Sequence, residues 1–252
     1  SDNTAVGTNC LIGNTTGTEN TVVGSGAARD ATTAAGNNCF GFLAGHELTT
    51  GANNTLIGRY ASAYDGTHLT TGSKNVIVGN FNKVSAADAS SQAVIGYYVT
   101  SAGDNSLTIG DGTTDSNIAY GATSITAPSD IRLKEDIQDE EVGLDFIKDL
   151  RPVTFQWKKE KDIPSDMKAY KEGSEERTMN GKYNHGFIAQ EVKEAIDKHN
   201  LKDGFDMWQE DEADGRQRVA PNAIMSVMVK AVQELSTQVD ELKSELLALK
   251  GE

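Results

Sequence analysis

The sequence has few of the residues that mark a disulfide framework, a nucleic-acid interface or a membrane span. Among 252 residues there are two cysteines, and 23 Lys and Arg stand against 37 Asp and Glu, for a net charge of −14. Two cysteines cannot make a disulfide framework, and a phosphate backbone needs clustered Lys and Arg. The chain also lacks a run of about 18 apolar residues that could cross a bilayer. We therefore expect no nucleic-acid partner and no membrane insertion.

The composition changes sharply near residue 128. Residues 1–128 hold 9 acidic and 4 basic residues and 18 of the 25 glycines. Residues 129–252 hold 28 acidic and 19 basic residues, all five methionines and both tryptophans. Because two such compositions must bury apolar surface in different ways, we expect a multidomain chain with domains at 1–128 and 129–252.

The first region repeats a unit of Asn, a small residue, two apolar residues and Gly. Copies stand at 3–7, 9–13, 20–24, 54–58 and 75–79, with variants at 92–96 and 105–110 and a shortened copy at 38–41. The units are too short for helices, and their β-branched residues favour strands, while Asn and Gly suit tight corners. One such strand cannot bury its own face, but stacked rungs can. The pattern predicts an all-β repetitive roll or shaft.

Few side chains of this region indicate chemistry. Cys10 and Cys39 each follow an Asn at one place in the repeat, which predicts two small buried residues. His46 and His68 lie in long spacers, and we expect both at the surface. The acids are scattered without a recurring pair, which disfavours a glycosidase. The Gly-Asp-Gly sequence at 110–112 predicts a turn, since it lacks the spaced oxygen ligands of a calcium loop. We expect no metal and no cofactor.

The second region predicts several short elements and one long helix. We expect an amphipathic helix at 143–150 with Leu144, Ile147 and Leu150 on one face, a strand at 153–157, a polar excursion at 158–182, a helix at 188–199 and a hairpin around the acidic turn 210–215. From Met225 to Leu249 the apolar residues are spaced alternately by three and four, which predicts a coiled coil over about 221–249. Such a seam predicts association with other chains.

Three blocks carry a family resemblance, at 129–137, 143–158 and 185–192. Together they resemble the intramolecular chaperone, or peptidase S74, domain that ends many phage tailspikes and tail fibres. The resemblance implies an α+β domain that drives homotrimer assembly and then cuts the bond between Pro128 and Ser129, with Ser129 and Lys134 as a catalytic dyad. The repeats at 1–128 are similar to the β-roll head repeats of trimeric adhesins and phage fibres.

The implied chemistry is sound for these residue types. A serine hydroxyl is a weak nucleophile that needs a base, and a lysine serves once its neutral form is favoured. Arg132 could disfavour the charge of Lys134, whereas Glu135 and Asp136 could favour it, and only geometry decides between them. His185 and Asp130 are candidate supporting residues. His185 could instead line a subunit contact or pack in the core.

We therefore expect a single-turnover, self-cleaving serine peptidase attached to a viral fibre fragment. The implied place is the virion, after assembly in the host cytoplasm and release of the chaperone domain. The alternative is a receptor-binding adhesin whose β region recognises a host glycan or protein. In that hypothesis the second region is a permanent trimerisation cap.

Overall fold

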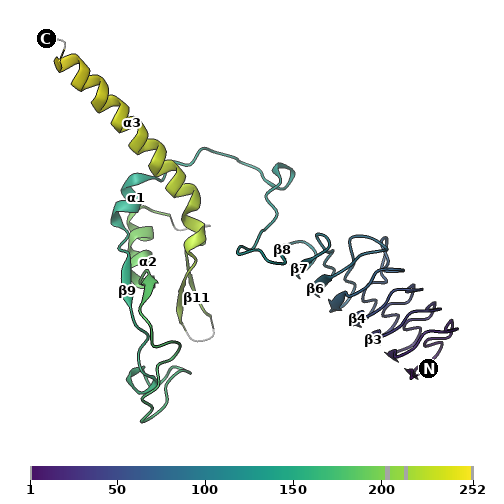
Figure 1. Ribbon diagram of the computed structural model, residues 1–252. Helices are drawn as coiled ribbons and strands as arrows, with labels where there is room; N and C mark the ends of the chain where they lie inside the picture. Colours follow the sequence, from purple (N-terminus) through teal and green to yellow (C-terminus); the bar gives the residue numbers. More distant parts are fainter. Residues whose placement is uncertain (1, 202–204, 213–214, 251–252) are drawn as a thin grey trace. The chain divides into compact units, whose positions relative to one another are not determined.

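The structure is a computed structural model that describes residues 2–201, 205–212 and 215–250. The chain forms two compact units, Ser1–Glu135 and Asp136–Glu252, called here the first and the second unit (Figure 1). The domain boundary expected after residue 128 stays a prediction. The multidomain layout agrees with the change of composition along the chain.

The first unit is a β-solenoid built from one eight-stranded sheet (Figure 1). Its strands, in sheet order, are β1 (Thr4–Val6), β2 (Thr21–Val23), β3 (Asn38–Phe40), β4 (Thr55–Ile57), β5 (Val76–Val78), β6 (Gln92–Gly96), β7 (Ser106–Gly110) and β8 (Asp115–Ala119). Strands β1 to β7 pair in parallel with their sequence neighbours, and β8 closes the sheet antiparallel to β7. The expected turn at 110–112 lies between β7 and β8, while β8 itself was not predicted.

The register of the sheet reveals a regular rung. Thr4 pairs with Thr21, Thr21 with Asn38, and Asn38 with Thr55, so each rung takes 17 residues. The next rung pairs Thr55 with Val76 and takes 21. Three residues of this longer rung, at 65–67, are exposed, so its extra length lies outside the stack.

Two expectations about the repeat were wrong. Residues 9–13 form turns instead of a strand, although they match the unit well. They lie on another side of the rung, where the Leu11 amide donates to the Ala27 carbonyl 3.1 Å away. The copy at 38–41 is in fact complete, because Asn37 takes the asparagine position and Asn38 the small-residue position. Apolar pairs followed by Gly occur both in the strands and in the turns of a rung. The glycines of the repeat are therefore irregularly spaced along the sequence.

The asparagine of the unit forms a ladder through the stack. Asn37 Nδ2 donates to Asn20 Oδ1 at 3.0 Å, and Asn37 Oδ1 accepts from the backbone and side-chain nitrogens of Asn54, each at 3.0 Å. Asn37 Nδ2 also donates to the Gly51 carbonyl at 2.9 Å. The same pattern connects Asn3 with Asn20 and Asn54 with Asn75. Since these buried amides are satisfied by equivalent amides, the ladder enforces the rung register.

The glycine of the unit is required by close stacking. A Cβ on Gly41, where φ is +137°, would lie 2.4 Å from the Gly58 carbonyl oxygen. Such an approach is far inside van der Waals contact, and the φ value disfavours any L side chain. The glycine therefore fixes the spacing of the rungs at this corner.

The solenoid core is filled by the middle residue of each strand from β2 to β6 and by small residues from the other sides. Val22, Cys39, Leu56 and Ile77 are fully buried in register. Burial of Cys39 was expected, and it raises the pKa of this thiol to about 12. Cys10 does not share its position, because it lies in a turn, half-buried, with Sγ 3.2 Å from the Val22 carbonyl oxygen.

The two histidines of the first unit are less exposed than expected. The side chain of His46 is 17% exposed and that of His68 is 20% exposed. They flank Glu47, whose Oε2 lies 2.6 Å from His68 Nδ1. The 21-residue rung brings His68 back to this carboxylate, which the expectation of a freely solvated spacer did not include.

The second unit combines two helices, two short hairpin-like pairs and a long C-terminal helix (Figure 1). Its elements are α1 (Leu144–Asp149), β9 (Val153–Phe155), η2 (Glu160–Asp162), β10 (Asn184–Gly186), α2 (Ala189–Lys198), β11 (Trp208–Glu210), β12 (Gln217–Val219), η3 (Pro221–Ile224) and α3 (Met225–Lys250). Strand β10 pairs antiparallel with β9, and β11 pairs antiparallel with β12. Both expected helices and the expected hairpin are present; part of the hairpin's turn, 213–214, lies outside the described residues.

The core of the second unit is centred on Phe146, which the sequence analysis did not place in it. Phe146 is fully buried among Val192, Met207 and Val227, with Ile147 and other residues packed around them. The expected face of Leu144, Ile147 and Leu150 follows helical spacing, but α1 has only six residues. The fully buried residue of α1 is therefore the aromatic Phe146, and not one of the aliphatic residues on the expected face.

The excursion at 158–182 is organised by one carboxylate. Glu160 is 8% exposed, and its two oxygens accept from Lys171 Nζ and Ser174 Oγ, both at 2.8 Å. These contacts hold the Glu160 pKa below its usual range, chiefly through the Lys171 hydrogen bond. The segment is therefore a folded excursion around a buried charge.

Helix α3 presents its heptad seam to solvent. One other face of its first turns is buried, through Val227 and Ala231, and the preceding turn adds Ile224. Each seam residue, by contrast, is at least 44% exposed: Met225, Met228, Val232, Leu235, Val239, Leu242, Leu246 and Leu249. The expected long helix is present, and among the described residues its seam is exposed from Met225 to Leu249.

Candidate functional site

Ser129 and Lys134 meet at the end of the first unit. A single turn of 3-10 helix, η1 (Ile131–Leu133), reverses the chain between them, with the Leu133 amide donating to the Asp130 carbonyl at 3.0 Å. Lys134 Nζ thereby comes to lie 2.8 Å from Ser129 Oγ. This distance is within hydrogen-bond range of a nucleophile and its candidate base. The geometry is made entirely by local sequence.

Asp130 builds the turn that positions the pair. It is the N-cap of η1, accepting the Arg132 amide on Oδ1 at 2.9 Å. The same carboxylate accepts from Arg132 Nε at 3.0 Å and from Nη2 at 2.5 Å. The Arg132 guanidinium and then its backbone amide hold the Asp130 pKa below its ordinary value. Arg132 is thus occupied by Asp130, which weakens the expectation that its charge acts on Lys134.

The pair lies in an exposed segment. Pro128, Ser129 and Lys134 are all exposed. The apolar side chains between and after the pair are exposed too, with Ile131 and Leu133 both at 72%. The hydrogen bond runs from Lys134 Nζ to Ser129 Oγ, which is the direction in which an ammonium group donates.

The arrangement can perform one reaction once the amine is neutral. Nζ can then accept the hydroxyl proton, and Oγ can attack the carbonyl that precedes Ser129 in the chain. Burying the segment would favour the neutral amine, because burial disfavours a charge. Ile131 and Leu133 of η1 are exposed apolar residues that the surface of a neighbouring domain or chain could cover.

The other candidate residues lie in the second unit. His185 is an exposed residue of β10, opposite Thr154 in β9. Its supporting role stays a prediction. Glu191, in α2, pairs within its own chain, where Arg151 Nε lies 3.0 Å from Oε2. The Asp130–Arg132 pair was not recognised from the sequence, although their spacing of two residues at a helix start could have indicated it.

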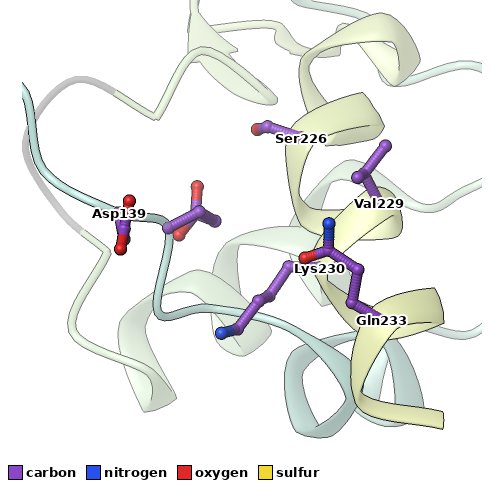
Figure 2. A pocket seen from close by; sticks show the side chains of 6 residues that line it. Asp139, Ser226, Val229, Lys230 and Gln233 are labelled. Carbon is purple, nitrogen blue, oxygen red and sulfur yellow. The ribbon is translucent and has the colours of Figure 1, made fainter. Parts of the chain in front are cut away.

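A second serine and lysine line a pocket of about 500 Å³ in the second unit. Figure 2 shows Ser226, Lys230 and Gln233 projecting from α3, with Asp139 on the segment facing them. Lys230 Nζ also lies 4.0 Å from Glu234 Oε1, with which it forms an ion pair. The amine that lines this pocket is therefore paired with a carboxylate of its own helix.

Within residues 2–201, 205–212 and 215–250, no group of three His, Cys, Asp or Glu side chains is placed to hold a metal ion. Across the same residues, no helix combines the length and apolar character needed to cross a membrane.

Comparison with known proteins gives one match. No curated protein and no solved structure matches the chain. The family model Peptidase_S74, described as chaperone of endosialidase, matches residues 129–201. That family is linked to trimerisation chaperones of phage tail proteins and to self-cleaving serine peptidase activity. Its match begins at Ser129, so residues 129–201 are similar to a chaperone-of-endosialidase domain, and a solenoid-like β region precedes them in the sequence.

Proposed function

We propose that this chain is a fibre fragment whose second region assembles a homotrimer and then frees itself by autoproteolysis between Pro128 and Ser129. The observation that carries the proposal is the 2.8 Å contact between Ser129 Oγ and Lys134 Nζ at the first residues of the family match. A nucleophile and a base at the edge of a domain suit a cut that releases that domain.

The reaction proceeds in two steps. Neutral Lys134 takes the Ser129 hydroxyl proton, and Oγ attacks the Pro128 carbonyl carbon. The C–N bond breaks, the Ser129 nitrogen takes a proton, and an ester joins Pro128 to Oγ. Water then attacks the ester and releases residues 1–128 with a carboxylate and residues 129–252 with a free amine. Each chain reacts once, and no cofactor takes part.

Two exposed apolar surfaces support association into a homotrimer. One is the heptad seam of α3, with every member at least 44% exposed. The other is the apolar stripe of the solenoid, formed by one residue of each strand from β1 to β7 in register, of which Val23 and Val78 are half-buried and the others exposed: Val6, Val23, Phe40, Ile57, Val78, Ile95 and Ile109. A stripe in register along all seven strands suits side-by-side packing of identical chains.

Association also gives the dyad what the isolated chain lacks. Ile131 and Leu133 are exposed beside Lys134, and a neighbouring chain that covered them would remove water from the amine. Cleavage would then follow assembly. The setting that fits best is a phage tail fibre or tailspike, assembled in the host cytoplasm and retained in the virion after the chaperone leaves.

The test is a comparison of the purified wild-type chain with Ser129→Ala, Lys134→Ala and Lys134→Arg on a denaturing gel, with intact mass. The wild type should give fragments of residues 1–128 and 129–252. All three variants should stay whole, because Arg keeps the charge but cannot act as a base.

Ser165→Ala is the matched control, since it removes an exposed serine hydroxyl far along the sequence from the proposed cut. It should be cleaved as the wild type is. A wild-type chain that forms trimers yet stays whole would exclude autoproteolysis and leave the second region as a permanent trimerisation cap.

A further inference from the structure

Six aromatic side chains gather on the outside of the solenoid. They are Phe42, Tyr60, Tyr64, Phe81, Tyr97 and Tyr98, here called the aromatic platform. The solenoid core is made of aliphatic residues, alanines and Cys39, and it includes none of these rings. Phe42 is 45% and Tyr97 is 52% exposed. The rings therefore form a surface feature that is separate from the packing of the rungs.

Three platform residues occupy a backbone conformation that large side chains avoid. Tyr60, Phe81 and Tyr98 each stand two residues after the glycine of the repeat, with φ of 54°, 60° and 60°. In an earlier rung the same corner holds Gly26, at φ 65°. Left-handed backbone is costly for bulky residues, and the corner can be made without a side chain. The rings are therefore not explained by the needs of the turn.

The three corner rings form a stack along the rungs. Tyr60 and Phe81 stack with centroids 5.7 Å apart and planes at 18°, and Phe81 and Tyr98 stack at 4.8 Å and 19°. Tyr64 and Tyr97 add edge-to-face contacts to Phe81 at 4.7 and 5.7 Å. Such contacts offset part of the backbone cost and hold the rings in fixed positions. A rigid ring surface loses little freedom when a ligand binds.

Polar groups are set among the rings. The Arg59 guanidinium lies 5.2 Å from the Phe81 centroid and 5.4 Å from that of Tyr60. A hydrogen bond with Tyr64, followed by burial, raises the pKa of Tyr98 to about 12. The platform thus combines ring faces with a guanidinium and phenol hydroxyls. Sugars need this combination, because a pyranose ring has an apolar C–H face and a rim of hydroxyls.

The platform also departs from the repeat, whereas the apolar stripe follows it. The stripe continues over all seven parallel strands, as expected for packing against identical chains in register. The platform occupies only the rungs between Phe42 and Tyr98, and Gly26 and Leu43 hold its corner position in the rungs before. An interface between copies should recur with the rungs, but a ligand site need not.

We propose that the aromatic platform binds a glycan, with pyranose C–H faces stacked on the rings of Phe81 and Tyr98. Arg59 donates hydrogen bonds to hydroxyls, or to a carboxylate where the sugar has one. The site goes beyond assembly and self-cleavage and does not depend on them, since residues 42–98 are present in the whole chain and in the released fragment.

The test is binding of the full-length protein to a printed array of neutral and carboxylated hexose oligosaccharides. The strongest binder is then titrated by calorimetry. Phe81→Gly and Tyr98→Gly should each raise its dissociation constant about tenfold or more, while keeping the β-sheet circular dichroism signal, because Gly26 shows that the corner accepts glycine. Leu43→Gly is the matched control, since it changes the same corner without removing a ring, and it should bind normally.

If the glycine variants fail to fold, Tyr97→Ala tests the same proposal, because it removes an exposed ring of the platform. Binding of a sugar that is lost with the rings supports the proposal. Three results would overturn it: a protein that binds no oligosaccharide on the array, ring variants that bind as the wild type does, or ring variants whose main effect is a lower oligomeric mass by light scattering. The last would assign the rings to contact with a second copy of the chain.

Discussion

In the first unit the buried asparagine side chains are bonded by equivalent asparagines of neighbouring rungs, whereas in the second unit the heptad seam of α3 is exposed among the described residues. Asn37, for example, makes hydrogen bonds to the rung before it and to the rung after it. In α3, Val227 is buried while Val232 and Leu235 remain exposed. The difference indicates that the solenoid takes its register from within, and it supports the proposal that association completes the second unit.

The same comparison indicates what the proposed trimerisation through α3 would do for a solenoid. Rungs of similar sequence can align between chains with a slip of one rung at modest cost, since the exposed stripe repeats with them. The seam of α3 has no such repeat of the rung length. Joining three seams would therefore set the alignment before the shafts pack together.

The largest expected effect is on association. Leu235→Glu places a charge at one layer of the seam, where three copies would meet, and should weaken assembly by about 100-fold or more. Light scattering against concentration measures it. Thr237→Glu adds the same charge on the opposite face of the helix and should leave the mass unchanged. Equal mass for Leu235→Glu and the wild type would mean that the seam is not an interface.

A smaller effect is expected on the stability of the first unit. Asn37→Ala interrupts the asparagine ladder and leaves the buried backbone amide of Asn54 without its hydrogen-bond acceptor. The expected cost is about 3 kcal/mol in the free energy of unfolding. Asn38→Ala changes the neighbouring exposed position and should cost well under 1 kcal/mol. Denaturant melts of the two variants give the difference. Similar midpoints would show that the ladder does not set the register.

The smallest effect concerns acid stability of the second unit. Lys198 and then His199 hold the Asp149 pKa below its ordinary value of 3.8, with His199 Nε2 2.6 Å from the carboxylate. A lowered folded pKa stabilises the fold above the ordinary value, and this contribution is lost as pH falls through the lowered one. Asp149→Asn should therefore flatten the acid side of the stability curve slightly. An unchanged slope below pH 3.8 would contradict this.

The architecture of the first unit followed from the repeat, but its register did not. Residues 9–13 match the unit as well as the true strands do, and only the stacking of backbone on backbone separates them. The asparagine is a better guide than the apolar pair, because only a buried side chain that bonds to both neighbours must recur once per rung. Strand β8 was missed because 115–119 has almost no apolar residues, and it is held by pairing to β7.

Only part of the candidate site could be predicted from the sequence. Ser129 and Lys134 were named through the family resemblance, and their approach depends on a turn that Asp130 caps, a local feature readable in principle. The aromatic platform was overlooked because its members are scattered over 57 residues, from Phe42 to Tyr98. Aromatic residues two positions after the repeat glycine, at Tyr60, Phe81 and Tyr98, were the available signal.

The asparagine ladder has a consequence for how such a shaft can change length. Because each amide bonds to an equivalent amide in the rung before and the rung after, whole rungs are interchangeable at their ends. An inserted or deleted multiple of a rung leaves every junction chemically identical, whereas a partial rung breaks the ladder. Extra residues are tolerated outside the stack, as at 65–67. Such a shaft can therefore be lengthened by duplicating whole rungs, and rungs can be grafted between related chains. In both cases the new junction forms at the asparagine ladder.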